Sequence, residues 1–370
     1  EDGLSGPDPV LRQMFTDEEH VLFGSSPHTG LLWALEVLGW SVPHLGRVVN
    51  LLARLDRIDP GSELRDEDDR TGRLANRPLA SLKAIFRSWL PETAARLEER
   101  LRALDRLRTS QSDVAWVVML SMLPEHHAAA FPSAKPAFRD WALDAGQPAT
   151  YGEIARTTRE VVGRLREDAG TSGARWADLV QRLPMLPTEE REAVVNDLET
   201  LDLDALGEAD RAAIWSGLRE LVSQHRAFRS AEWAMPEEYV QRLDQLRGRF
   251  APSDPIALYG WLFGHDPHLP DGDVFESSWE ARREAVRSER VKAVEAMLRE
   301  GGLKVLITLA EQVDNPFAVG HAAGSTDASL PHADDLLSLL ANPAPPLAHL
   351  AAGFAVARRQ AYGDEWVVEQ

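Results

Sequence analysis

The stretch GLLWALEVLGWSVPHLGRVVNLLARLDRID, residues 30–59, determines the fold class that the sequence predicts. Its leucines and valines recur at steps of three and four residues, first over residues 31–38 and again over residues 45–55. This spacing places the side chains on one face of a helical turn and predicts two amphipathic helices. Ser41 precedes the second helix and is expected to cap it, while Pro43 fits its first turn. The stretch therefore predicts a helical hairpin.

The same periodicity continues along the chain, and strand-like alternation is nearly absent. Further helices are predicted over residues 78–89, 92–108, 114–123, 151–167, 174–183, 189–201, 210–227, 236–250, 255–263, 276–299, 303–313, 333–340 and 347–361. Short links that contain proline and glycine separate them, which makes consecutive helices antiparallel neighbours. No strict period of about 34 or 40 residues is visible. The sequence thus predicts an all-α fold, an irregular α-solenoid of stacked antiparallel helix pairs of the HEAT, ARM or TPR kind.

Breaks in the helical pattern suggest a division of the chain into segments. We expect an N-terminal, partly irregular lead (1–29), an N-terminal helical array (30–123), a joint loop rich in Ala, Pro and His (124–149), a C-terminal helical array (150–318), and a loose segment with terminal capping helices (319–370). The loose part is expected at residues 319–331, because Gly, Ser and Thr are frequent there. The charge run ELRDEDDRTG, residues 63–72, is expected to be a solvated loop.

Composition restricts the classes of partner. The 370 residues carry 40 Lys plus Arg and 59 Asp plus Glu, a formal charge of -19. This charge disfavours nucleic acid and anionic lipid surfaces. The most apolar stretches, such as residues 30–40 and 114–123, are about ten residues long, roughly half of the ~20 that a membrane-spanning helix needs. The chain has no cysteine and opens without a signal peptide or Met, so we expect a cytoplasmic piece of a longer polypeptide.

One cluster has residue types that bind divalent metals. His265 and His268, followed by Asp271 and Asp273, bring imidazoles and carboxylates together. The alternative is a turn followed by acids that favour the start of a helix, and it is the better interpretation of this proline-containing stretch. A phosphate-binding P-loop and a G-x-S-x-G nucleophile motif are missing from the sequence. We therefore expect no cofactor, and an enzyme with an unrecognised metal site is the third hypothesis.

A second hypothesis is a nucleic-acid-binding groove. Arg73, Arg77, Lys83 and Arg87 recur around a predicted helix and would form its basic face. The net charge of the chain argues against it, although binding depends on the local field and not on the sum.

Three stretches carry a resemblance to a known group of proteins: residues 30–40 (GLLWALEVLGW), 73–89 (RLANRPLASLKAIFRSW) and 213–238 (AIWSGLRELVSQHRAFRSAEWAMPEE). They resemble the helical region of large, mostly uncharacterised bacterial proteins described as STAND-type NTPases or antiphage-like sensors. The resemblance spans about residues 30–318 and implies a sensor or scaffold array, with a nucleotide switch or effector elsewhere in the parent chain. The sequence departs from that pattern at residues 63–71, where an acidic loop is inserted.

The first hypothesis follows from the helix series and from the resemblance. It is a non-enzymatic protein-interaction module, a sensor or scaffold within a larger cytoplasmic bacterial protein. Its partner would be another protein or another domain of its own parent chain. The 11 tryptophans, spread along the predicted helices, are expected to pack between helix pairs.

Overall fold

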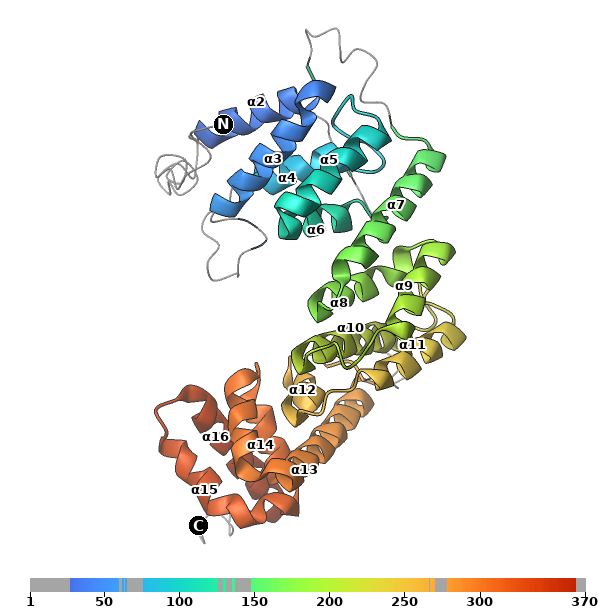
Figure 1. The fold of residues 1–370 in the computed structure, drawn as a ribbon. Helices are drawn as coiled ribbons and strands as arrows, with labels where there is room; N and C mark the ends of the chain where they lie inside the picture. The colour runs from blue at the N-terminus through green and yellow to red at the C-terminus, as the bar shows by residue number, and fades with distance from the viewer. Residues whose placement is uncertain are drawn as a thin grey trace. The chain divides into compact units, whose positions relative to one another are not determined.

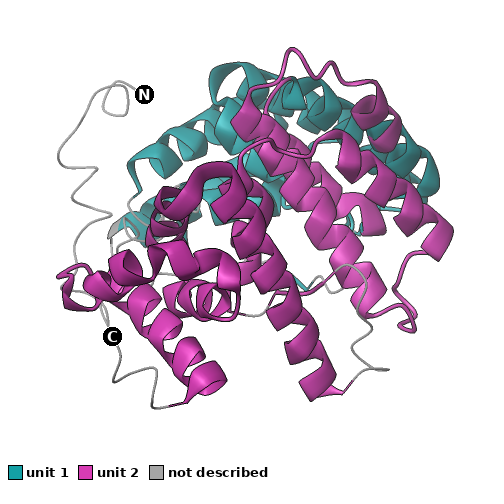
Figure 2. Ribbon diagram, turned by 90° about the horizontal axis from the view of Figure 1, so that it is seen from below, with its two compact units in different colours: residues 1–170, 185–194 teal, residues 171–184, 195–370 magenta. Residues whose placement is uncertain are grey.

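The computed structural model describes residues 27–59, 62, 64, 76–125, 129–130, 135–136, 148–265, 267–269 and 278–363. Every regular element within these ranges is a helix, as Figure 1 shows, which confirms the predicted all-α class. Within the same ranges, no helix combines the length and the apolar character that crossing a bilayer requires. The chain divides into two compact units (Figure 2): unit 1 comprises Glu1–Gly170 and Met185–Val194, and unit 2 comprises Thr171–Pro184 and Val195–Gln370.

The helices of the described residues divide between the two units. Unit 1 contains α2 (Pro27–Gly39), α3 (Val42–Ile58), α4 (Pro78–Phe86), α5 (Leu97–Ser110), α6 (Ser112–Ser121) and α7 (Tyr151–Ala169). Helix α9 (Thr188–Thr200) begins in unit 1 and ends in unit 2. Unit 2 contains α8 (Gly173–Arg182), α10 (Glu208–Ala227), α11 (Glu237–Arg249), α12 (Pro255–Tyr259), α13 (Trp279–Gln312), α14 (Pro316–Gly324), α15 (Ala333–Ser338) and α16 (Pro345–Tyr362), with short 3-10 turns at Gly260–Phe263, Asp327–His332 and Leu339–Ala341. A further 3-10 turn, Leu183–Met185, crosses the boundary between the units in the sequence.

The predicted hairpin at residues 30–59 is present as α2 and α3. Pro43 lies in the first turn of α3 as expected, but Ser41 makes no side-chain capping bond. The turn is held from outside instead: the Thr93 hydroxyl donates to the Gly39 carbonyl at 2.8 Å, and the Ala94 amide donates to the Trp40 carbonyl at 3.1 Å. These bonds need a non-helical backbone around Thr93. The helix predicted to start at residue 92 therefore starts at Leu97.

Helix α3 is the centre of the unit 1 core, because it packs against α2, α4 and α5. Its buried positions follow the predicted spacing: Leu45, Val48, Val49, Leu52 and Leu55 are all at most 2% exposed. The described side chains of α3 thus form one apolar face toward three neighbouring helices and one polar face toward solvent.

An ion-pair network fastens α5 to α7 at the edge of unit 1. Arg108 contacts Glu167 at 3.0 Å and Asp168 at 2.7 Å, and Arg164 of α7 contacts Asp105 of α5 at 2.7 Å. Hydrogen bonds from Arg164, and secondarily from Arg108, lower the pKa of Asp105 below its ordinary value. Several partly buried pairs that share partners are more effective than isolated surface pairs in fixing two helices.

In unit 2 glycines allow helices to approach closely. A Cβ atom on Gly320 or Gly324 of α14 would overlap the backbone of α16, and one on Gly353 of α16 would overlap the carbonyl oxygen of Phe317. The prediction that residues 319–331 form a loose segment is therefore wrong. The glycines that suggested a loop are buried at a helix crossing, and Asp327–His332 forms a 3-10 turn.

Other predicted boundaries fall as follows. The predicted helices 276–299 and 303–313 correspond to the two parts of α13, which a kink at Gly302 separates as predicted: its φ of 64° and ψ of -160° are non-helical values that favour glycine. The predicted joint 124–149 falls within unit 1, and most of it lies outside the described residues, as do residues 1–26 of the predicted lead.

The close crossing of α14 and α16 leads to a stability prediction. Gly353→Ala is expected to lower the free energy of unfolding by about 2–3 kcal/mol, because its methyl group forces the two backbones apart. Gly248→Ala is the matched control, since nothing lies within 4 Å of its Cβ position in α11. Alanine there is expected to be neutral or to stabilise by up to about 1 kcal/mol. Urea unfolding followed by circular dichroism measures both, and equal stability of the two variants would contradict the close approach.

Candidate functional site

The outward face of α2 is apolar. Its exposed positions in the described part of the helix are Gly30, Trp33, Ala34, Val37 and Leu38, and none of them is charged. Trp33 is 61% exposed, Val37 37% and Leu38 45%. We call Trp33, Ala34, Val37 and Leu38 the α2 ridge.

The opposite face of α2 is anchored in the core. Leu32 and Leu35 are buried, and the Cβ position of Gly39 lies against side-chain atoms of Val48 and Ile85. The α2 ridge is therefore carried by a fixed helix. A helix that is apolar on all sides is usually buried on all sides, which makes the exposed ridge a candidate binding surface.

The one acidic side chain of α2 is bound to α4. The Ser81 hydroxyl donates to Glu36 Oε1 at 2.6 Å. Burial raises the pKa of Glu36 above its ordinary value, and the nearby negative charge of Glu92 acts in the same direction. Glu36 is thus turned toward α4 and does not interrupt the apolar ridge.

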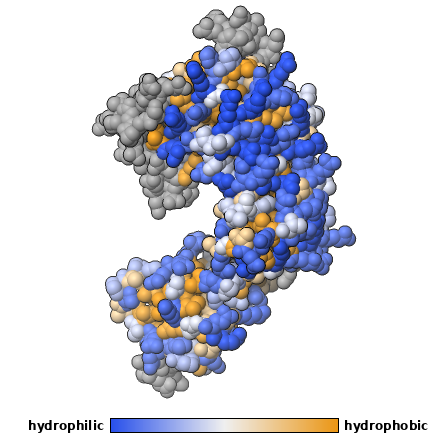
Figure 3. Space-filling view, viewed as in Figure 1, coloured by the Kyte–Doolittle hydropathy of each residue, from blue (hydrophilic) through white to orange (hydrophobic). Residues whose placement is uncertain are grey.

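Hydrophobic residues are also exposed in unit 2. Figure 3 shows a mostly hydrophilic face with hydrophobic residues gathered over α14–α16. The large exposed side chains there are Phe317, Leu330, Leu340, Val356 and Tyr362, between 38% and 54% exposed. They come from four separate elements, whereas the α2 ridge is a continuous stripe on one helix. The ridge is the stronger candidate for this reason.

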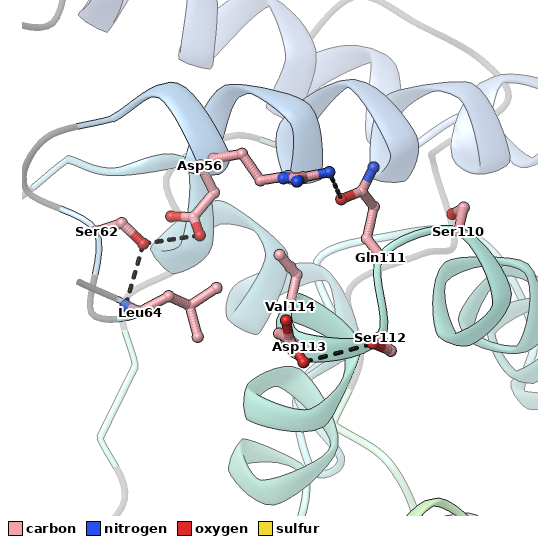
Figure 4. Close-up of a pocket in the computed structure, with 9 residues that line it drawn as sticks. Asp56, Ser62, Leu64, Ser110, Gln111, Ser112, Asp113 and Val114 are labelled. Carbon is pink, nitrogen blue, oxygen red and sulfur yellow. Dashed lines mark hydrogen bonds between the residues drawn. The ribbon is translucent and has the colours of Figure 1, made fainter.

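A polar pocket of about 660 Å³ lies where α3 ends and α6 begins (Figure 4). It is lined by Asp56, Arg57, Ser62, Leu64, Ser110, Gln111, Ser112, Asp113 and Val114. The Ser62 hydroxyl donates to Asp56 Oδ2 at 2.9 Å, and Arg57 Nη1 donates to Gln111 Oε1 at 3.2 Å. These side chains bind one another, so the contacts fix the end of α3 against the start of α6.

The predicted metal cluster is not assembled by the described residues. His265 and His268 are both exposed, and Asp271 and Asp273 lie outside the described residues. In the part of the chain that is described, no group of three or more His, Asp or Glu side chains is arranged to hold a metal ion. The ring of His268 lies 6.4 Å from that of Phe228, centroid to centroid.

The predicted basic face has paired cations. Arg77 Nη1 lies 2.6 Å from Asp59 Oδ1, and Arg87 Nη1 lies 3.2 Å from Glu92 Oε1. Lys83 is half-buried on α4, and Arg73 lies outside the described residues. At least two of the four cations therefore neutralise acids of unit 1 itself.

The sequence analysis missed the α2 ridge. Trp33 was expected to pack between helices like the other tryptophans, and it is exposed. The sequence does contain a signal for the exposed ridge: Glu36 is the one charged residue between Gly30 and Ser41. One charged residue is not enough to give a helix a polar face toward solvent.

Comparison with known proteins found no matching family model, no matching curated protein and no matching solved structure.

The half-buried carboxyl of Glu36 gives a pH-dependent prediction. Because its pKa is raised on folding, its contribution to stability is present at low pH and is lost as the pH rises through the raised pKa. Glu36→Gln stays neutral, so its stability relative to the wild type should increase between pH 4.5 and pH 7.5. Urea unfolding at several pH values measures this difference. Glu311→Gln, on the exposed surface of α13, is the control, and a pH-independent difference for Glu36→Gln would contradict the prediction.

Proposed function

We propose that this chain is a non-enzymatic protein-interaction module and that the α2 ridge is the surface by which it contacts a partner protein. The observation that carries the proposal is the uncharged, exposed stripe of Trp33, Val37 and Leu38 on a helix whose other face is fixed in the core. Exposed contiguous apolar side chains mark interaction sites in soluble proteins. Tryptophan in particular contributes strongly at interfaces.

The proposal includes an irregular α-solenoid of stacked helix pairs. Supporting it, successive helices pack against one another within each unit: α2 on α3, α5 on α6, α10 on α11 and α13 on α14. Arrays of this kind bury the apolar face of each pair against the next pair and offer extended surfaces to partners.

The biological setting is proposed from the sequence resemblance. The chain would serve as a sensor or scaffold within a larger cytoplasmic bacterial protein of the STAND-type signalling or antiphage class. Its partner would be another protein or another domain of its parent. In that setting an apolar surface such as the α2 ridge becomes covered when the partner binds.

Changing the ridge tests the proposed function. The double variant Val37→Ser, Leu38→Ser is expected to retain its fold, since both side chains are exposed. Its affinity for any protein that the wild type captures from bacterial lysate should fall about tenfold or more, and tenfold corresponds to about 1.4 kcal/mol of binding free energy. Quantitative mass spectrometry of the captured proteins measures this loss.

The matched control is Val356→Ser on α16 of unit 2, a valine that is 38% exposed, as Val37 is 37% exposed. It should capture the same proteins as the wild type. Unchanged capture by the ridge variant, or no capture by the wild type from lysates of infected and uninfected bacteria, would contradict the proposed function.

A further inference from the structure

A buried histidine fastens the segment that connects α10 to α11, residues 228–236, which we call the α10–α11 link. His225 lies in the last turn of α10 and is 2% exposed. The backbone amide of Met235, near the other end of the link, donates to His225 Nδ1 at 3.0 Å. Met235 is also buried, and it directly precedes Pro236, the N-cap residue of α11. This hydrogen bond therefore joins the end of α10 to the residues from which α11 begins.

Aromatic rings gather around the same imidazole. The ring of Trp233 meets that of His225 edge to face, with centroids 5.3 Å apart. The ring of Phe228 lies 5.7 Å from that of Trp233, centroid to centroid. Trp233 is 42% exposed, so its indole forms the outer part of the group. We call His225, Phe228, Trp233 and Met235 the His225 cluster.

Other backbone bonds of the link are local. The Ala231 amide donates to the Phe228 carbonyl at 2.9 Å, and the Ala234 amide donates to the Ala231 carbonyl at 3.0 Å. Each of these bonds closes one turn within the link. The bond from Met235 to His225, in contrast, spans ten residues and attaches the far end of the link to α10.

The direction of this bond fixes the protonation of His225. A backbone amide only donates, so Nδ1 offers its lone pair and the proton of the neutral ring is on Nε2. A second proton goes to Nδ1 and turns the acceptor into a donor that faces another donor. The hydrogen bond is then lost, and a positive charge is left in a buried, partly aromatic site.

Charged groups lie on the elements around the cluster, because α8 and α11 both pack against α10. They are Arg226 of α10, Arg182 at the end of α8, Glu232 of the link, Glu237 and Asp244 of α11, and His268 beside Phe228. Arg226 contacts Glu237 at 3.3 Å and Asp244 at 3.0 Å, so these charges bind one another. Burial is what lowers the pKa of His225 below its ordinary value.

We propose that protonation of His225 opens the α10–α11 link and exposes Met235 to solvent. In the open form the imidazolium reaches water, and the Met235 amide exchanges its nitrogen acceptor for water. Helices α10 and α11 stay together, because Arg226 binds Glu237 and Asp244 as long as those carboxylates are ionised. The link is thus an acid-sensitive switch in unit 2, and it does not depend on the α2 ridge.

Acid favours the open form for a thermodynamic reason. The pKa of His225 is lowered while the link is closed and returns toward its ordinary value of 6.5 when the ring meets water. The open form therefore binds protons more strongly, and its population rises as the pH falls. The stability of the closed link is complete above pH 6.5 and decreases as the pH falls from there toward the lowered pKa.

Hydrogen exchange of the Met235 amide in the full chain tests the switch. Its protection factor, which corrects for the intrinsic pH dependence of exchange, should fall about tenfold or more between pH 7.5 and pH 5. The amide of Leu243, which is buried in α11, is the internal control and should keep its protection factor. Imidazole nitrogen chemical shifts measure the tautomer and the titration of His225 in the same sample.

Three variants identify the group that responds to acid. His225→Asn does not titrate, and its side-chain oxygen takes the place of Nδ1 as an acceptor, so protection of the Met235 amide should no longer depend on pH. His349→Gln, at an exposed position of α16, is the matched control and should behave like the wild type. His268→Gln removes the histidine beside Phe228 and should also behave like the wild type.

Several outcomes would overturn the proposal. One is loss of Met235 protection that persists in His225→Asn or disappears in His268→Gln, because another group would then sense the acid. Another is a neutral His225 with its proton on Nδ1, or a His225 that titrates while Met235 stays protected. The last two are measured in the wild type, so they decide the question even if His225→Asn does not fold.

Discussion

The burial of α3 among α2, α4 and α5 is the constraint on which the surface of unit 1 depends. Leucine and valine at steps of three and four residues, together with Ala53 and Asp56, occupy its inward face. That single packing arrangement fixes α2 on one flank and α5 on the other. It therefore also fixes the helix that carries the α2 ridge. The ridge would not form a defined surface on a helix that moved independently.

Neighbouring helices are fixed by two different physical means. In the described part of unit 1, partly buried arginine–carboxylate networks such as Arg108 with Asp168 join α5 to α7. In unit 2, Gly320 and Gly353 remove side-chain volume so that α14 and α16 touch along their backbones. Charge networks tolerate small shifts and depend on pH and salt, whereas a glycine crossing tolerates almost no added volume.

Much of the fold was predictable because apolar periodicity is a local signal. The α2–α3 hairpin, and most later helices to within a few residues, follow from it. The errors come from tertiary contacts that overrule local preference. Thr93 and Ala94 bind the α2–α3 turn, so α5 begins later in the sequence than predicted. Gly320 has the residue type of a loop, and only the close contact with α16 shows why a residue without a side chain is required there. The site was less predictable, since the exposure of Trp33 depends on which face of α2 meets α3 and α4.

Net charge was the least informative quantity for the site. The sum of -19 argues against any anionic partner, yet the field at a surface depends on which charges reach it. Asp56 and Asp59 of the α3 end are turned inward, where Ser62 and Arg77 bind them, and Asp105 is held by Arg164. The acids at the end of α3 and the central acid of α5 thus stabilise the helix packing. The sum of the charges therefore does not give the field at any one face of the unit.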